Sequence, residues 1–175
     1  MIDIKALQRP LRDAYQADPA GAPLTLTVRS APSDLGDPLH CAVTPDSTPD
    51  VVWRSGAHPA VGGVGDVPCS GDLLLGALAA CQEVTLRMVA ANQGVELLDV
   101  QVEVEGDWDP RGTLAMGREF PVGLTAIRCS TSVRVGEGVN EERAARLLKS
   151  AERYCVVLNT LRAGMDVQSE FSLTV

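Results

Sequence analysis

The clearest pattern of hydrophobic and polar positions lies in residues 70–94. Ser70 and Asp72 favour a helix start and Gly94 a helix end, so this stretch predicts a helix of about six turns. Its first half, residues 73–81, is apolar on every side, which is typical of a helix that is buried all round. We therefore expect this helix to form the centre of the molecule.

Segments on both sides of this helix alternate between apolar and polar residues, which predicts half-buried strands. Before the helix they lie within residues 24–54, and after it within residues 100–105, 127–135 and 165–175. Helices and strands do not alternate regularly along the chain. The order therefore favours an α+β domain, with antiparallel strands packed on helices, over a doubly wound sheet.

Two further helices are predicted from residue spacing and end signals. Residues 3–17 repeat apolar side chains at helical intervals, although Pro10 would bend or split the helix. The arm that residues 1–20 form would pack either on a partner subunit or on its own domain. Another helix should begin after Asn140, because acidic residues follow in its first turn and basic residues in its last.

The composition bounds the class of protein. A chain of 175 residues is expected to form one domain, here residues 1–175. A net charge of −8 argues against nucleic-acid binding and against attachment to an anionic membrane. The N-terminus lacks the apolar core of a signal peptide, and the strongest apolar run, residues 73–81, is too short to span a bilayer. We therefore expect a cytoplasmic protein.

The chain has five cysteines, an odd number without close pairs, which favours free thiols in a reducing compartment. They are Cys41, Cys69, Cys81, Cys129 and Cys155. A cysteine among apolar residues is most often a small core residue, and we expect this role for Cys129. Cys41 follows His40, but neighbours on a strand point to opposite faces and form no local pair. The sequence has no zinc-binding spacing and no phosphate-binding loop, so neither a metal nor a bound cofactor is expected.

Cys69 stands directly before the predicted helix start. The helix dipole would favour its thiolate form there, which makes Cys69 a candidate reactive thiol. Twelve residues separate it from Cys81, roughly 18 Å along a continuous helix. The two cysteines could therefore bridge only if the helix began late.

Two stretches that contain cysteine resemble the motifs of one family. Residues 72–81, Asp-Leu-Leu-Leu-Gly-Ala-Leu-Ala-Ala-Cys, are followed by Thr85 and Leu86. They look like the central-helix motif of the OsmC/Ohr family, the osmotically inducible and organic hydroperoxide resistance proteins. Residues 152–155, Glu-Arg-Tyr-Cys, are followed by Asn159 and a closing strand, and are similar to the second cysteine motif of that family.

The resemblance covers about residues 50–175 and implies an α+β fold. In this fold antiparallel sheets wrap around long central helices in an intertwined homodimer, and the active sites lie at the subunit interface. Residues 24–54 would give the N-terminal strands and residues 70–94 the central helix. Residues 98–175 would give the C-terminal strands and the helix that carries the second cysteine.

The resemblance also implies a thiol peroxidase that takes part in oxidative stress defence. The Cys81 thiolate would attack a hydroperoxide, release an alcohol and become a sulfenic acid. Cys155 would condense with the sulfenic acid to a disulfide. An external dithiol or lipoyl-type reductant would restore both thiols. The implied partners are a second copy of the chain, a small (organic) hydroperoxide and this reductant.

Two positions depart from the pattern of the family. Gly71 stands where the family has a glutamate that orients an arginine, and Val156 replaces the proline that follows the second cysteine. The family's arginine stabilises the thiolate, because a buried thiol otherwise keeps its proton. We assign this role to Arg54, which precedes the expected active-site loop, with Arg29 as the second candidate.

Two further residues near the altered position are candidates for the site. Asp72 is the nearest carboxylate, although its side chain would point elsewhere on the helix, and Cys69 is a candidate third thiol. The departures leave a second function open. On the same scaffold the protein would be a non-catalytic thiol redox sensor, or a dimer that binds a small apolar ligand.

Overall fold

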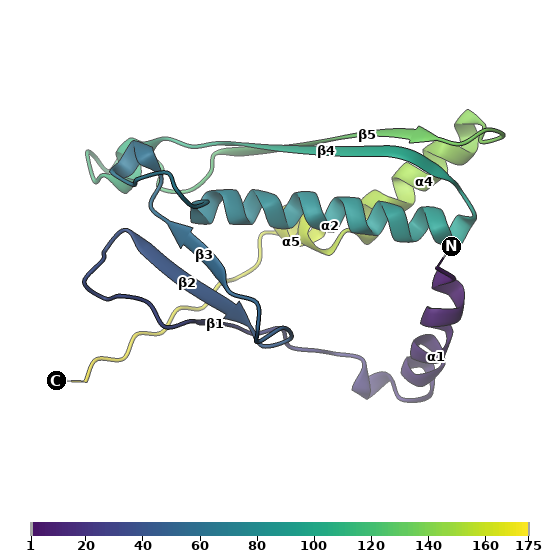
Figure 1. Cartoon of the computed structure of the whole chain (residues 1–175), viewed down its shortest axis with the longest axis horizontal. Helices are drawn as coiled ribbons and strands as arrows, with labels where there is room; N and C mark the ends of the chain where they lie inside the picture. Colours follow the sequence, from purple (N-terminus) through teal and green to yellow (C-terminus); the bar gives the residue numbers. More distant parts are fainter. Residues whose placement is uncertain (1, 175) are drawn as a thin grey trace.

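A computed structural model describes residues 2–174 and shows an α+β protein built along one long helix (Figure 1). Helix α2 (Ser70–Gln93) runs beside the antiparallel strands β4 (Leu97–Asp107) and β5 (Ala126–Val135). The other elements are α1 (Ile4–Ala17), β1 (Val28–Ser30), β2 (His40–Pro45), β3 (Trp53–Gly56), α3 (Pro110–Thr113), α4 (Glu141–Tyr154), α5 (Val156–Ala163) and two short 3₁₀ turns (Pro19–Gly21, Pro59–Val61). The expected α+β class with antiparallel sheets is therefore confirmed for the single chain.

Both ends of α2 lie where the sequence predicts them. Cys69 is the residue before the first turn, and its backbone N–H donates to the Asp72 carboxylate at 2.8 Å. An acidic group in the first turn suits the positive end of the helix dipole. Gly94 ends the helix with a φ of 62°, a left-handed conformation that glycine adopts at little cost.

The expectation that the first half of α2 is buried all round is wrong for the single chain. Leu78 and Leu86 are buried, at 1% and 0% exposed, whereas Leu74 and Val84 are 41% and 55% exposed. The buried side of α2 packs against β4 and α4. That core consists of Leu86, Ala90, Val95, Leu147 and Ala151. The other side of α2 is apolar, yet the described residues of one chain leave it partly open.

The alternating residues of β4 and β5 form the expected half-buried face. Val100 lies opposite Val133 and Val104 lies opposite Cys129 in the antiparallel register. The polar residues between them are exposed. The sheet therefore covers α2 with one side and faces solvent with the other.

The strands at the two ends of the chain are shorter than predicted. In the sheet β1–β2–β3 the first strand begins only at Val28, and Leu24 and Leu26 are 78% and 88% exposed. Residues 165–174 are extended but pair with no strand among the described residues, so the final strand is absent from the single chain. A strand needs a free neighbouring edge, which residue alternation alone cannot supply.

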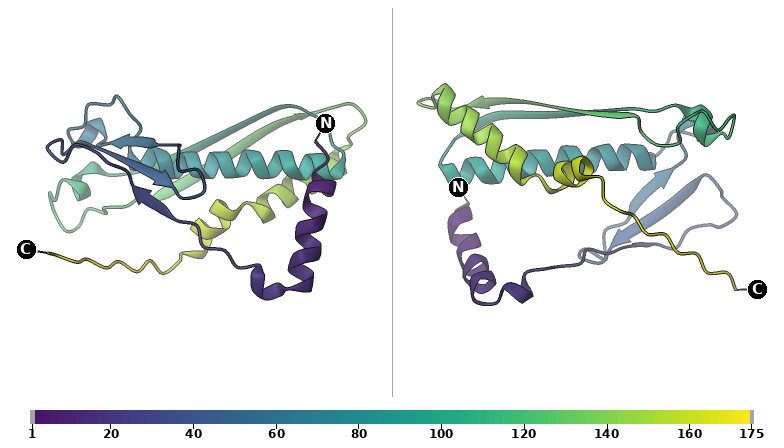
Figure 2. Two further views of the ribbon diagram at one scale, coloured as in Figure 1. Left: turned by 60° about the horizontal axis from the view of Figure 1, so that its bottom comes forward. Right: turned by 180° about the vertical axis from the view of Figure 1, so that it is seen from behind.

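Helix α1 is one continuous element even though it contains Pro10. Of the two predicted effects of Pro10, a bend or a split, the split is therefore wrong. Its apolar residues Leu7 and Leu11 are 61% and 53% exposed, and none of its residues is buried. Figure 2 shows α1 beside the C-terminal end of α2, joined to β1 by an extended segment.

Helix α2 is also the one described helix that is long and apolar enough to cross a membrane by length and composition. The shorter run considered in the sequence, residues 73–81, understated its apolar length. This is weak evidence for a span, because the core helix of a soluble protein passes the same criterion.

Candidate active site

The two cysteines of the family motifs lie on helices that meet. Cys81 is half-buried in the middle of α2, and Cys155 is fully buried between α4 and α5. Helix α4 runs from the end of β5 towards the middle of α2, where α5 begins (Figure 2). At Cys155 the backbone leaves the helical conformation, with φ −72° and ψ 107°, so that α5 starts in a new direction.

The structure brings Cys81 and Cys155 together, although they are far apart in the sequence. Hydrogen bonding with the Cys155 thiol is one of the influences that lower the pKa of the Cys81 thiol. The other lowering influences are hydrogen bonding with the backbone N–H of Val157, with the hydroxyl of Thr85 and with the backbone N–H of Val156. Both N–H groups belong to the first turn of α5, where backbone N–H groups have no acceptor within the helix.

These neighbours decide the protonation of Cys81. Partial burial, the largest influence, acts to raise the pKa of the Cys81 thiol. Hydrogen bonding acts in the opposite direction and has the larger combined effect, so the pKa of the Cys81 thiol lies below its ordinary value. The positive end of the α5 dipole acts in the same direction. Cys81 is thus the thiol of the pair that ionises more easily.

Cys155 is shifted in the opposite direction. Burial raises the pKa of the Cys155 thiol, and the neighbouring sulfurs of Cys81 and Cys129 raise it further, against a hydrogen bond from the N–H of Leu158 that lowers it. Cys155 therefore keeps its proton when Cys81 loses its own. Two like groups whose surroundings separate their pKa values can take different chemical roles.

Asn159 stabilises the junction between α4 and α5, at which Cys155 lies, by hydrogen bonds. Its side-chain amide donates to the carbonyl oxygens of Cys155 at 2.7 Å, Arg153 at 3.1 Å and Glu152 at 3.3 Å. Its backbone N–H donates to the Cys155 carbonyl as well, at 3.1 Å. Sequence reasoning noted Asn159 only as part of a motif. An asparagine four residues after a cysteine, at a junction between two helices, is the signal that could have revealed this role.

The structure of one chain does not bring the predicted arginines to the thiols. Arg29 forms a two-fold ion pair with Asp46, at 3.0 and 3.1 Å, on the surface. Arg54 lines a different pocket, of about 340 Å³, together with Asp66. Neither arginine is among the groups that shift the pKa of Cys81.

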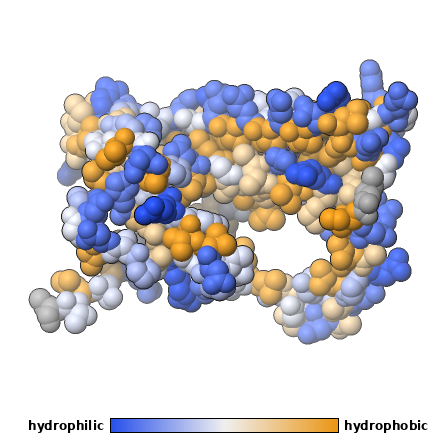
Figure 3. Space-filling model, viewed as in Figure 1, coloured by the Kyte–Doolittle hydropathy of each residue, from blue (hydrophilic) through white to orange (hydrophobic). Residues whose placement is uncertain are grey.

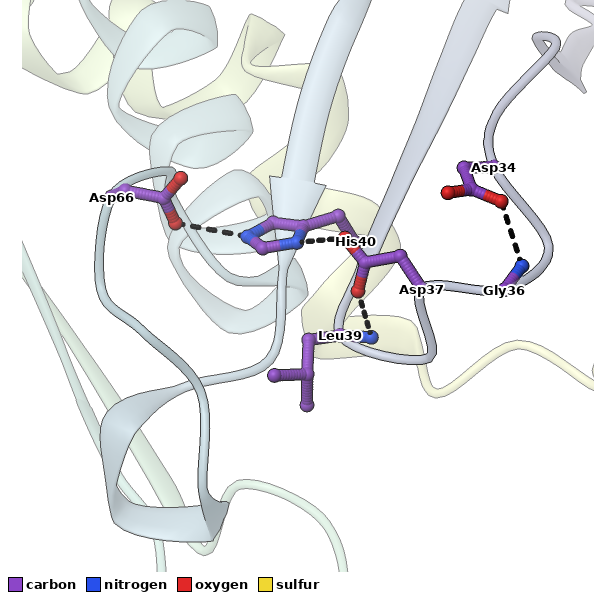
Figure 4. A network of polar contacts seen from close by, with 6 residues as sticks. All are labelled: Asp34, Gly36, Asp37, Leu39, His40 and Asp66. Atoms are coloured by element: carbon purple, nitrogen blue, oxygen red, sulfur yellow. Dashed lines mark hydrogen bonds and ion pairs between the residues drawn. The ribbon is translucent and has the colours of Figure 1, made fainter.

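The pocket beside Arg54 contains a histidine held between two carboxylates (Figure 4). His40 Nδ1 lies 2.7 Å from Asp37 and Nε2 lies 2.9 Å from Asp66. Hydrogen bonding to Asp66 and then to Asp37 raises the pKa of His40, because both carboxylates favour the imidazolium. The cluster ties the start of β2 to the loop that leads into α2.

Cys69, Asp72 and Gly71 lie at the start of α2, on the same continuous helix as Cys81. Cys69 and Asp72 make the first-turn contact already described, which is a structural role. The nearest atom to a side chain placed at Gly71 would be the Cys69 sulfur, at 3.4 Å, so the position has room for a larger residue. These residues line a separate cavity of about 570 Å³ together with His58 and Trp108.

No group of three or more histidine, cysteine, aspartate or glutamate side chains in residues 2–174 could hold a metal ion.

The fold and the site define an α+β protein with a pair of unequal thiols. Residues 63–170 match the family model described as OsmC-like protein, so the chain belongs to the OsmC-like family, of which it is a divergent branch. No curated protein matches the chain.

Solved structures share this fold at low identity. An OsmC-like protein from Mycoplasma pneumoniae is 15% identical, with a TM-score of 0.63 over 81% of this chain and 89% of that one. An organic hydroperoxide resistance protein OsmC from Legionella pneumophila is 21% identical, with a TM-score of 0.58 over 84% and 96%. An organic hydroperoxide resistance protein from Elizabethkingia anophelis is 17% identical, with a TM-score of 0.57 over 82% and 91%. At these identities the likeness concerns the fold.

Proposed function

We propose that the protein is a cysteine-based peroxidase that reduces organic hydroperoxides. The observation that carries the proposal is the contact between Cys81 and Cys155, whose pKa values are shifted in opposite directions. A thiolate next to a protonated thiol is the arrangement that a two-cysteine peroxidase needs. The names of the Legionella and Elizabethkingia relatives, organic hydroperoxide resistance proteins, support the choice of substrate.

The reaction proceeds in three balanced steps. The Cys81 thiolate attacks the terminal peroxide oxygen, the O–O bond breaks, and the alkoxide leaves and takes a proton to form the alcohol. The Cys155 thiol then attacks the Cys81 sulfenic acid, and a disulfide and water form. Finally an external dithiol, of lipoyl type in this proposal, gives two electrons and two protons to the disulfide and is itself oxidised to a disulfide. We expect this cycle in a reducing, cytoplasmic environment.

The first test is turnover by the purified protein. With cumene hydroperoxide and excess dithiol, the wild-type protein should consume many equivalents of peroxide, and Cys81→Ser should reduce this to the rate of the dithiol alone. Cys41→Ser, which changes an exposed cysteine of β2, is the matched control and should keep the wild-type rate. Unchanged turnover in Cys81→Ser would reject the proposal.

The alternative is a thiol redox sensor without turnover. It is favoured by the absence of Arg54 and Arg29 from the groups that act on Cys81 in one chain. A sensor would be oxidised once per pair of thiols and would then stop, even with a dithiol present. The same experiment therefore separates the two functions.

We also propose that the protein works as a homodimer. Among the residues that the structure describes, residues 165–174 pair with no strand, and Phe171 and Leu173 are 96% and 89% exposed. Within the same residues β5 pairs only with β4, and its side chains line an open cavity of about 750 Å³. Figure 3 shows apolar surface along α2 on the face in view. A second copy that added this segment to β5 and covered α2 would bury these residues. It could also supply the arginine that one chain does not bring to Cys81.

A further inference from the structure

A large cavity lies on the half-buried side of β5, between this strand and the helices α2, α4 and α5. Its volume is about 750 Å³, within the range of about 300–1,000 Å³ that is typical of small-molecule sites. Leu78, Ile127 and Leu158 are among its apolar walls. Cys81 and Cys155 are not among the described residues that line it. The cavity is therefore distinct from the redox pair.

Gln82 brings an unsatisfied hydrogen-bond acceptor to this cavity. The residue lines the cavity and is only 9% exposed. Its Oε1 atom is buried and has no hydrogen-bond partner among the residues that the structure describes. A buried acceptor without a donor costs free energy, and such atoms are rare in folded proteins. We therefore expect a molecule in the cavity to supply a donor to this amide.

The charged side chains of the walls give the cavity a net positive charge. They are Lys149 and Glu152 on α4 and Arg162 on α5. Arg162 and Glu152 form an ion pair, with Arg162 Nη2 2.8 Å from Glu152 Oε1, so these two charges largely cancel. The ammonium group of Lys149 remains, and it attracts anions. A ligand that suits these walls therefore carries a negative group as well as a donor.

We propose that this cavity is a binding site for a small organic anion. Such a ligand has an apolar body, a carboxylate or similar acidic group that pairs with Lys149, and an N–H or O–H group that donates to Gln82. The apolar walls bury the body of the ligand, and the two polar contacts fix its orientation. The inference goes beyond the proposed peroxidase function and does not depend on it.

The dye 6-(p-toluidino)naphthalene-2-sulfonate tests the site, because it combines aromatic rings, an N–H group and an anionic sulfonate. Fluorescence titration of the full-length reduced protein should show one bound dye per chain. N-(p-tolyl)-2-naphthylamine has the same rings and N–H group without the sulfonate. Lys149→Gln should weaken binding of the sulfonate about tenfold and leave binding of the neutral compound unchanged. Lys5→Gln, which changes the other lysine of the chain, on α1, is the matched control and should leave both unchanged.

Gln82→Met tests the role of the amide. The substitution removes the unsatisfied oxygen at nearly the same side-chain length. It should therefore raise the melting temperature of the free protein, and weaken binding of both compounds about fivefold because the acceptor is lost. A glutamine that served only the fold would change stability and leave binding intact. If ordered water alone met Oε1, binding would likewise not depend on this residue, and the inference would fail.

The thiol of Cys129 reports where the dye binds. Cys129 lines the cavity, whereas Cys41 lies on β2, away from it. At a dye concentration about ten times Kd, alkylation of Cys129 by N-ethylmaleimide should be about tenfold slower, and alkylation of Cys41 should be unchanged. Mass spectrometry of the digested protein follows both residues. A wild-type protein that binds no dye, equal affinities in wild type and Lys149→Gln, or a Cys129 that the dye does not protect would overturn the inference.

Discussion

Cys81 and Cys155 differ because of what surrounds each sulfur. Hydrogen bonding with the backbone at the start of α5 lowers the pKa of the Cys81 thiol, whereas burial raises that of Cys155 against a smaller lowering influence of the Leu158 N–H. Burial opposes ionisation at both residues, and only the donors at Cys81 overcome it. The chemical roles of the two thiols are therefore set by a helix junction and not by the residues next to them in the sequence.

A substitution at Asn159 tests this junction. Asn159→Asp replaces a donor by a carboxylate that faces three carbonyl oxygens, so we expect it to lower the free energy of unfolding by about 1–3 kcal/mol. It should also raise the midpoint of Cys81 alkylation, because the first turn of α5 loses its anchor. Urea unfolding and alkylation at varied pH measure the two effects.

Asn140→Asp is the control for this substitution. Asn140 accepts a hydrogen bond from the Arg143 N–H at 2.9 Å, and an aspartate accepts it equally well at a helix start. Its stability should stay close to that of the wild type. If both variants behaved alike, Asn159 would have no special role at the junction.

At the scale of elements, His40 joins the start of β2 to the loop before α2. The raised pKa of His40 means that its contribution to stability is fully present below pH 6.5, the ordinary value, and is lost as the pH rises through the higher pKa of the folded state. Above that point a neutral imidazole can donate to Asp37 or to Asp66, but not to both. Arg54, near Asp66, is then the cation left in this pocket.

We predict that the melting temperature of the wild-type protein falls as the pH rises through this range, and that His40→Ala removes this dependence. His58→Ala, which changes the other histidine of the chain, should keep it. Thermal unfolding at a series of pH values measures the effect. The same pH dependence in His40→Ala and wild type would show that the contacts of His40 do not stabilise the fold.

Elements were predictable from the sequence where their signals are local. Both ends of α2 and the alternating face of β4 and β5 were predicted, because end residues and periodicity are properties of the segment itself. Helix α5 is not predicted as a separate element, since Cys155 carries no usual cap signal, although Asn159 donates hydrogen bonds to three carbonyl oxygens at this break. The prediction of a final strand at residues 165–175 is wrong for the single chain for a different reason. A strand needs the edge of another strand to pair with, and that edge lies outside its own segment.

The candidate site divides in the same way. Cys81 and Cys155 can be named from two motifs. The backbone groups that lower the pKa of Cys81 cannot, because nearly every residue type has a backbone N–H. The positions of Arg54 and Arg29 in the chain suggest them as candidates, but in the structure Arg29 pairs with Asp46 and Arg54 lines a different pocket. Position in the chain alone does not tell which arginine, if any, lies beside a thiol in the folded structure.

For the whole molecule, the exposed apolar residues predict how the protein assembles. Phe171 and Leu35 are 96% and 97% exposed in one chain, but only Phe171 lies on the segment that we expect to join a second copy. Phe171→Asp should therefore weaken the dimer and shift the protein towards monomer, because a charge would be buried at the interface. Leu35→Asp should leave the mass unchanged. Light scattering over a range of protein concentrations gives the mass, and a wild-type protein that is monomeric throughout would contradict the dimer.

The central claim is that Cys81 and Cys155 form one redox pair. Its most direct test is to treat the reduced wild-type protein with one equivalent of cumene hydroperoxide, without dithiol, and to map the disulfides by mass spectrometry of the digested protein. We predict one new disulfide, between Cys81 and Cys155, in nearly all molecules. A Cys155 that stays reduced, while Cys81 remains a sulfenic acid or pairs with Cys69, would contradict the account.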